Sequence, residues 1–387
     1  MPKSRPNAPR KSQLKHQVQD AQVMALCTLA NRLCTQADHP SSEKWADDMS
    51  VLVENYLQHG KDRLLAEAIA RCGELYDNDA ANDLLTHVEI FSESVILDEG
   101  DTDASRTAGL FLIPVMFSDA HGLKTVHVPS GPNFQKIGDS LKLAGLVSDS
   151  ARVVLGDRLY TAPELLLPWS KVLRLASHLV TPDAEPNPIP VTQGDDEAPQ
   201  DDVRAPTEQQ GEKSLLGLRF LAGVVIDDKA ERPFSAPDDR MDFERWMDRK
   251  CLWEDAAGGL LCDALGDAYT GAFAQVESVD AYHEAFRRGI AEFKMVGLHI
   301  QAHRILEAAG TAPTDIEAQL SLVVEPENRE KIQVTFVAVD QGRELGTTSV
   351  IIHPFERRYD LMNVTMDNLE SLDLRSVYFP EAEAGSQ

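Results

Sequence analysis

Hydrophobic side chains near the start of the chain repeat with the period of an α-helix in three successive segments. Apolar residues three and four positions apart form one face of a helix, so each segment predicts an amphipathic helix. Short polar connections join the segments, and Gly60 is suited to end the second one, so we expect neighbouring helices to pack antiparallel. The three stripes are Val23, Leu26, Cys27, Ala30, Leu33 and Cys34, then Trp45, Met49, Leu52, Val53 and Tyr56, then Leu64, Leu65, Ala68, Ile69 and Cys72.

After residue 87 the spacing of apolar residues changes to that of β-strands. Short apolar runs separated by turn residues predict a small sheet. A helix is then expected from Thr161 to about residue 179, because Pro163 and Glu164 complete a capping-box start. The predicted strands are 88–97, 110–117, 125–128 and 153–155.

The second half of the chain also mixes strand and helix patterns. Along 319–323 polar and apolar residues alternate, which favours an antiparallel sheet covered by helices on one side. The strands predicted here are 216–226, 272–276, 316–324, 332–339 and 347–352. The helices predicted here are 241–250, 253–265 and 279–309.

Large apolar residues nearly vanish between 181 and 213, where proline and acidic residues accumulate. Such a segment cannot bury enough apolar surface to offset the entropy lost on ordering, so it predicts a flexible linker. The predicted fold class is therefore α+β, with two domains that are each a small, mainly antiparallel sheet packed with helices. In chain order we expect a disordered basic arm (1–16), a helical layer with a small sheet (17–180), a disordered acidic and proline-rich linker (181–213), an α+β domain (214–378) and a disordered tail (379–387).

The composition agrees with a folded protein rather than a disordered one. Of the 387 residues, 43% are hydrophobic and 26% are charged, both close to globular averages. No apolar run approaches the roughly 20 residues of a membrane-spanning helix. The first residues are basic but lack the apolar segment of a secretory signal, so we expect a cytoplasmic protein with no membrane association. The five cysteines are odd in number and form no C-x-x-C pair, which argues against a disulfide framework or a zinc knuckle.

The net charge of −26 limits the partners that this chain can bind. Most of the surface would repel a phosphate backbone, which excludes a broad nucleic-acid-binding face. Only the predicted N-terminal arm offers a contact to nucleic acid or to an acidic partner, and a solvated tail is the alternative. The arm carries no acidic residue before Asp20, and its basic residues are Lys3, Arg5, Arg10, Lys11 and Lys15.

Four stretches carry a resemblance to a known family. SESVILDEG, GLFLIPVMFSD, VHVPSGP and DRLYTAPELL resemble, in order and spacing, an uncharacterised bacterial family catalogued as a domain of unknown function. The similarity extends through SVDAYHEAFRRGI and the closing strands, and it covers most of the chain apart from the arm and the linker. It implies a full-length, two-part architecture and carries over no reaction, cofactor or catalytic residue.

No nucleotide or hydrolase motif is present, since the sequence lacks a P-loop, a G-x-G-x-x-G turn and a G-x-S-x-G elbow. The best metal candidate is His299 with His303, because i,i+4 spacing puts both imidazoles on one helix face, near Glu292. The glutamate of an H-E-x-x-H motif is replaced by Ile300, so the catalytic carboxylate is missing. The alternative is that both histidines form hydrogen bonds at the edge of the apolar stripe. We expect no cofactor.

A loop with an anion-binding composition precedes the helix expected at 137–143. The backbone amides of Ser130, Gly131 and Asn133 are candidates to face an anion at the start of that helix. The alternative is a rigid turn that uses proline and glycine for their backbone angles.

Two basic pairs and four histidines complete the list of candidate groups. The pairs Arg287-Arg288 and Arg357-Arg358 are interpreted as surface charge, with a clamp for a carboxylate or phosphate as the alternative. The histidines available as general bases are His121, His127, His283 and His353.

The sequence assigns no catalytic residue. It favours a cytoplasmic binding, regulatory or scaffold protein with a protein partner, because the arm and the linker resemble interaction segments. The alternative is an enzyme with a site between the two domains and an unknown reaction.

Overall fold

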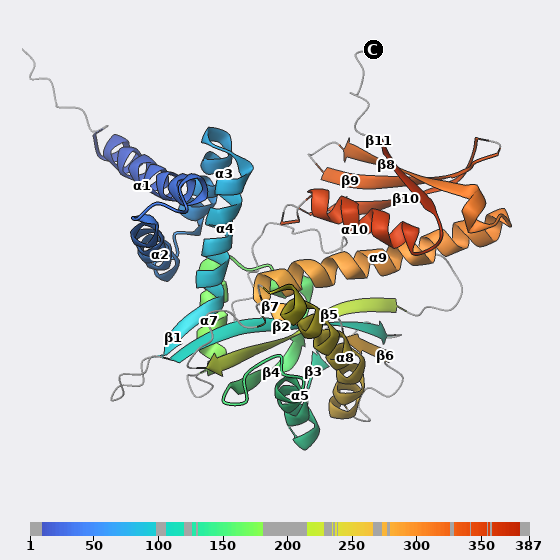
Figure 1. Cartoon of the computed structure of the whole chain (residues 1–387), viewed down its shortest axis with the longest axis horizontal. Coiled ribbons are helices and arrows are strands. Elements are labelled where there is room, and N and C mark those ends of the chain that lie inside the picture. The colour runs from blue at the N-terminus through green and yellow to red at the C-terminus, as the bar shows by residue number, and fades with distance from the viewer. Residues whose placement is uncertain are drawn as a thin grey trace, which may run out of the picture.

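The computed structural model of the chain consists of a helical layer, a large sheet and a smaller sheet (Figure 1). The predicted α+β class is confirmed, because two mainly antiparallel sheets pack against helices. The predicted linker at 181–213 lies outside the described residues, as do 1–9 and 380–387 of the predicted arm and tail. The structure describes residues 10–97, 106–119, 126–128, 131–180, 215–227, 239–265, 273–276, 279–325, 329–340, 342–353, 355–356 and 358–379, together with Phe234 and Pro237.

The three predicted apolar stripes, apart from Trp45, form the core of the helical layer. Leu26, Met49 and Leu65, one from each of the three predicted helices, are fully buried in one cluster. The side chains of Cys27 and Cys72 are buried in the same cluster. The thiols therefore act as small apolar side chains in this core. The layer comprises α1 (Arg10–Thr35), α2 (Ser42–Gln58), α3 (Asp62–Leu75) and α4 (Asn78–Glu93).

Both ends of the helical layer differ from the prediction. Helix α1 begins at Arg10, so residues 10–16 of the predicted disordered arm are helical. At the other end, the strand predicted at 88–97 is helical up to Glu93, and only β1 (Ser94–Leu97) remains extended. The reason is burial, because Val88 lies at 0% exposure in the helical core, where a helix satisfies its own backbone.

The large sheet has seven strands in the order β1-β2-β5-β4-β3, and β6 and β7 also pair with β2. All of these pairs are antiparallel. Besides β1, the strands are β2 (Arg106–Asp119), β3 (Val126–His127), β4 (Arg152–Tyr160), β5 (Leu215–Asp227), β6 (Phe273–Val276) and β7 (Asp280–Ala281).

The strand predicted to open the second domain, 216–226, lies instead in the middle of the large sheet. As β5 it pairs with β2 along its whole length, for example Val224 with Leu110, and with β4 on its other edge. The cause is its continuous apolar sequence, since Phe220 and Val224 are both fully buried. A strand of this kind needs partners on both edges and cover on both faces, which only a central position provides.

Helices cover both faces of the large sheet. On one face lie α5 (Pro132–Leu143) and α8 (Arg240–Leu265), and on the other lie α6 (Ala162–Leu165), α7 (Trp169–Val180) and the first half of α9 (Tyr282–Ala309). Helix α8 is continuous where two helices were predicted. The single helix predicted from Thr161 is split into α6 and α7, with Pro168 between them.

The smaller sheet has four strands in the order β10-β9-β8-β11. Its strands are antiparallel except for β11, which runs parallel to β8. Neither α10 nor β11 was predicted, and together they form the crossover that returns the chain to β8. The elements are the short 3₁₀ turn η2 (Pro313–Asp315), β8 (Ile316–Glu325), β9 (Arg329–Ala338), β10 (Arg343–Ile352), α10 (Arg358–Glu370) and β11 (Arg375–Phe379).

Helix α9 joins the two sheets, and Figure 1 shows it running between them. Phe286 and Ile290 in its first half belong to the core of the large sheet, whereas Leu298 and Ala302 in its second half belong to the core of the smaller one. No helix of the described residues is long and apolar enough to span a bilayer.

Candidate functional site

The two histidines of the predicted metal site lie on α9 with ring centroids 6.5 Å apart. Ring Nε2 of His299 is 3.3 Å from the backbone oxygen of Asn368 in α10. A hydrogen bond of this kind, at the edge of the apolar stripe, was the alternative to metal binding. In the part of the chain that the structure describes, no group of three His, Cys, Asp or Glu side chains is arranged to hold a metal ion. The metal site at His299, His303 and Glu292 stays a prediction.

The predicted anion loop is only partly described. Gly131 is the residue before α5 and has an extended backbone, with φ of −173° and ψ of 178°. Ser130 lies outside the described residues, and so does the side chain of Asn133. A Cβ at Gly131 would meet no atom within 4 Å, so nothing in its surroundings requires glycine there. The anion site stays a prediction.

The arginines of the two predicted basic pairs bind different carboxylates. Arg287 of α9 donates to both carboxylate oxygens of Glu89 in α4, at 2.5 and 3.1 Å. Arg358 of α10 donates through Nε to Glu330 of β9 at 3.0 Å. These bidentate pairs hold neighbouring elements together, and Arg357 lies outside the described residues. The described members Arg287 and Arg358 thus each hold a carboxylate of a different element, and the clamp stays a prediction.

A buried ion pair lies beside the start of α9, and the sequence did not reveal it. Nζ of Lys250 in α8 donates to Oδ2 of Asp280 in β7 at 2.8 Å, and Arg288 of α9 pairs with the same oxygen at 3.1 Å. The Lys250 side chain is only 1% exposed. Burial lowers the pKa of Lys250, while the Asp280 carboxylate opposes that change. The Lys250 ammonium also lies 4.6 Å from the centroid of the Trp246 ring.

His283, one of the four candidate general bases, joins a second polar cluster at the start of α9. Its ring Nε2 is 2.9 Å from Oγ of Ser92, which is itself fully buried in α4. The backbone N–H of His283 donates to Oε1 of Glu93 at 2.7 Å. The hydroxyl of Tyr282 donates to the backbone oxygen of Leu165 at 2.6 Å. The start of α9 is thus tied to α4, α6 and α8 by buried polar contacts.

Of the other three candidate histidines, His353 has a described side chain. The ring of His353 stacks on Phe355 with centroids 5.2 Å apart, and the side chains of His121 and His127 lie outside the described residues. The Lys250–Asp280 pair could not be predicted from the sequence, because its members are 30 positions apart. One signal was available: Lys250 occupies an inward position of the α8 stripe, between Trp246 and Trp253.

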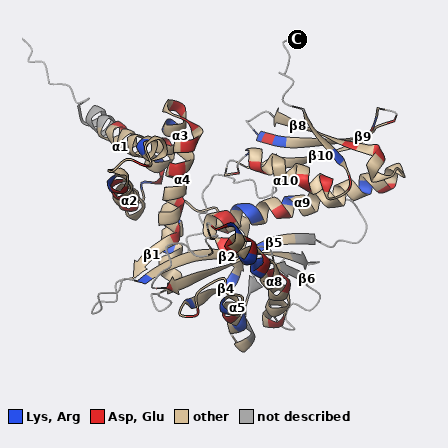
Figure 2. Ribbon diagram, viewed as in Figure 1, with Lys and Arg blue, Asp and Glu red and all other residues tan. Residues whose placement is uncertain are grey.

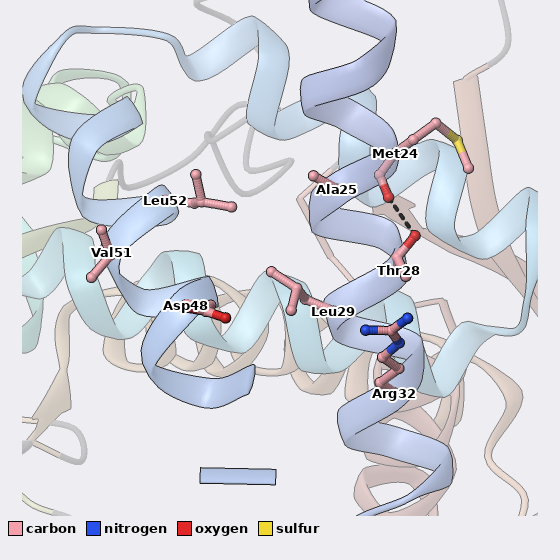
Figure 3. A pocket seen from close by; sticks show the side chains of 8 residues that line it. All are labelled: Met24, Ala25, Thr28, Leu29, Arg32, Asp48, Val51 and Leu52. Atoms are coloured by element: carbon pink, nitrogen blue, oxygen red, sulfur yellow. Dashed lines mark hydrogen bonds between the residues drawn. The ribbon is translucent and has the colours of Figure 1, made fainter. Parts of the chain in front are cut away.

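An open groove lies on the helical layer, between α1 and α2 (Figure 3). Its volume is about 600 Å³. Val51 is 65% exposed and Met24 is 36% exposed, so the groove presents apolar side chains to solvent. The hydroxyl of Thr28 donates to the backbone oxygen of Met24 at 2.7 Å, which satisfies it within α1. The lining residues are Met24, Ala25, Thr28, Leu29, Arg32, Asp48, Val51 and Leu52.

Charge is concentrated at one end of this groove. Arg32 of α1 and Asp48 of α2 both line it, and the Arg32 guanidinium lies 5.5 Å from the centroid of the Trp45 ring. Between residues 18 and 93 the sequence has fourteen acidic and five basic residues, a net charge of −9. Figure 2 shows these acidic residues distributed over α2, α3 and α4. The groove is therefore an apolar opening in an acidic layer.

Comparisons with protein-family models, with curated protein sequences and with solved structures find no match to this chain. The resemblance drawn from the sequence thus gains no family assignment from them. The function has to be argued from the residues of the groove and of the buried clusters.

Proposed function

We propose that this chain is a cytoplasmic binding or scaffold protein, which binds a protein partner through the groove between α1 and α2. The observation that carries the proposal is the exposure of apolar side chains in the groove, above all Val51 and Met24. Exposed apolar surface that is concave and rimmed by polar residues is typical of sites that bind another protein.

The location of the polar groups supports a binding role over a catalytic one. Lys250, whose pKa is lowered by burial, is closed to solvent together with its partner Asp280, since the two side chains are 1% and 7% exposed. Ser92 beside His283 is fully buried as well. These contacts join α4, α8 and α9, whereas the groove on α1 and α2 is open to solvent.

The test compares two single substitutions of exposed apolar residues. Val51→Asp places a charge in the groove, whereas Leu143→Asp places the same charge at a site on α5 that is 89% exposed. The tagged proteins are purified gently from the native cells, and the proteins that co-purify are quantified by mass spectrometry. We expect a partner that is reduced about tenfold, or roughly 1.4 kcal/mol of binding free energy, by Val51→Asp and retained by Leu143→Asp.

If both variants retain the same proteins in the same amounts as the wild type, the groove is not the binding site. Circular dichroism of each variant checks that the fold is intact. Because Val51 and Leu143 are both largely exposed, neither substitution is expected to unfold the protein.

One observation favours the alternative, in which the chain is an enzyme. A lysine whose pKa is lowered by burial is a frequent nucleophile or general base, and Lys250 has such a pKa. A native mass spectrum that shows a stoichiometric small-molecule adduct on the wild type, and none on Lys250→Met, would favour the enzyme.

A further inference from the structure

Two cysteines from different helices lie in contact in the core of the helical layer. Sγ of Cys27 in α1 donates to the backbone oxygen of Ala68 in α3 at 3.3 Å. In an α-helix the oxygen of residue 68 accepts from the N–H of residue 72, so this contact places Cys27 against the turn that carries Cys72. The two thiols are also hydrogen-bonded to each other. Both side chains are fully buried in one cluster.

Small side chains let the backbones of α1 and α3 approach each other at this contact. Ala30 lies about one turn after Cys27, Ala68 lies one turn before Cys72, and both alanines are fully buried in the same cluster. A disulfide requires the two Cα atoms to lie about 4.4–6.8 Å apart. Because the two sulfur atoms already contact each other, small rotations of the side chains bring them to bonding distance.

The other three cysteines have different surroundings. Cys251 and Cys262 of α8 are exposed, and Cys34, two turns after Cys27 in α1, is partly buried. They serve as internal references for the reactivity of the buried pair, because an oxidant dissolved in water reaches an exposed thiol without any movement of the chain.

We propose that Cys27 and Cys72 form a redox modification site, at which a small-molecule disulfide oxidises the two thiols to one disulfide that ties α1 to α3. The inference goes beyond the proposed function and does not depend on it. Residues of α1 also line the groove. The disulfide therefore fixes one wall of the groove to α3.

The reaction consists of two thiol–disulfide exchanges, and glutathione disulfide represents this class of oxidant. The thiolate of Cys27 attacks one sulfur of the oxidant, which forms a mixed disulfide and releases one glutathione thiolate. The thiolate of Cys72 then attacks Sγ of Cys27, which closes the protein disulfide and releases the second glutathione thiolate. The oxidant gains two electrons from the pair. The two protons lost by the protein thiols end on the two glutathione molecules.

Burial controls the rate of this reaction. It raises the pKa of Cys27, and it raises the pKa of Cys72 to about 12, so the reactive thiolates are scarce in the closed core. The charge of Arg71 in α3 lowers the pKa of Cys27, which favours Cys27 as the first nucleophile. Because both side chains are fully buried, the first exchange requires α1 to open locally. In a reducing compartment the pair stays as two thiols, which act as apolar side chains.

The closing experiment counts the thiols of the full chain before and after incubation with glutathione disulfide. A background variant with Cys34→Ser, Cys251→Ser and Cys262→Ser leaves Cys27 and Cys72 as its thiols. We expect this variant to lose both thiols on the order of hours without gaining the mass of glutathione. Peptide mass spectrometry should find positions 27 and 72 linked, and dithiothreitol should restore both thiols.

A second measurement compares the urea concentration at which the oxidised and the reduced protein unfold. The oxidised form is expected to unfold at the higher concentration, because the disulfide closes a long loop of the unfolded chain. Two further variants of the same background are the controls. Cys27→Ser keeps a donor for the oxygen of Ala68, and Cys72→Ala keeps a small apolar side chain. Circular dichroism checks that both are folded, and neither should change its unfolding midpoint on incubation with the oxidant.

Several results overturn the proposal. Two thiols that persist in the folded background variant show that the pair is not a modification site, and so does a disulfide that forms in urea but not in its absence. A product that carries glutathione on both cysteines excludes the second exchange. A disulfide that lowers the unfolding midpoint shows that the bond does not fit the packing of α1 on α3. Oxidation of the pair as fast as the modification of Cys251 in the wild type contradicts the required opening of α1.

Discussion

At the scale of single residues, Lys250 carries a charge that is almost completely buried. An ammonium group that is only 1% exposed is tolerated because Asp280 and the ring of Trp246 lie against it. Asp280 is in turn shared with Arg288, so the three side chains form one network that joins α8, β7 and α9. Because burial in this network lowers the pKa of Lys250, the free energy of unfolding depends on pH.

Lys250 gives a pH prediction with a defined sign. Because its pKa is lowered from 10.5 in the folded protein, the unfolded chain binds more protons than the folded one between the lowered pKa and 10.5. The free energy of unfolding should therefore rise with pH in that window, by about 1.4 kcal/mol for each unit by which the pKa is lowered. Urea unfolding at several alkaline pH values measures it.

The control for this prediction is Lys250→Met, which keeps an unbranched apolar stem at the site and leaves Arg288 paired with Asp280. The difference in unfolding free energy between wild type and variant should grow in favour of the wild type as the pH rises. A difference that stays constant, or that shrinks, would show that Lys250 does not lose its proton more readily in the folded state.

At the scale of elements, the crossing of α9 over β2 depends on the absence of a side chain at Gly289. A Cβ at this position would lie 2.7 Å from Cβ of Pro114 and 2.9 Å from the ring of Phe220. Neither neighbour is free to withdraw, because Pro114 is part of β2 and Phe220 is fully buried in β5. A side chain at position 289 would therefore have to push α9 away from the sheet.

Gly289→Ala is expected to lower the free energy of unfolding by about 1–3 kcal/mol, because overpacking displaces α9 from the sheet. Gly259→Ala in α8 is the matched control, since a Cβ there meets no atom within 4 Å. That substitution should instead raise the free energy of unfolding by about 0.5–1 kcal/mol through helix propensity. Chemical denaturation measures both, and equal effects of the same sign would contradict the close approach.

At the scale of the whole molecule, β5 makes the two halves of the chain interdependent. It lies between β2 and β4, which both precede the predicted linker, and it supplies a neighbour to each of them. Its removal would expose a long apolar edge on β2 and another on β4. Exposed edges of this kind associate with other chains.

We therefore expect the fragment 17–180 to be insoluble or unfolded when it is expressed alone. Co-expression with the fragment 214–378 should return it to the soluble fraction, because β5 can pair with β2 in trans. The measurement is the soluble yield and the circular dichroism of each fragment, alone and together. A cooperatively folded, soluble 17–180 fragment would contradict the structural role assigned to β5.

Much of the local structure followed from the sequence because it depends on near neighbours. The stripes of α1, α2 and α3 were recognisable from spacings of three and four, and the burial of Leu26, Met49 and Leu65 confirms them. The strand at 88–97 was wrong over its first six residues, because Val88 suits a strand and a buried helix face equally well. The choice between them was made by packing against α1 and α3.

For the candidate sites, the sequence revealed the spacing of nearby residues but not the contacts between distant ones. The sequence named His299, His303 and Glu292 from their spacing, and it could not reveal that His299 meets Asn368, which is 69 positions away. The pairs Lys250 with Asp280 and Arg287 with Glu89 join residues that are 30 and 198 positions apart. No periodic pattern carries information over such distances along a chain.

The sequence is sufficient to predict the α+β class, the helical stripes and most strands, because side-chain periodicity and burial are properties of short segments. The position of β5 within the sheet of the first half is revealed only by the tertiary structure. It alone also showed that α9 spans two cores, and that a groove opens between α1 and α2. The physical reason is that the sequence of an apolar strand shows that the strand must be covered and paired, but not which strand is its partner. The partner is chosen by the packing of the whole chain.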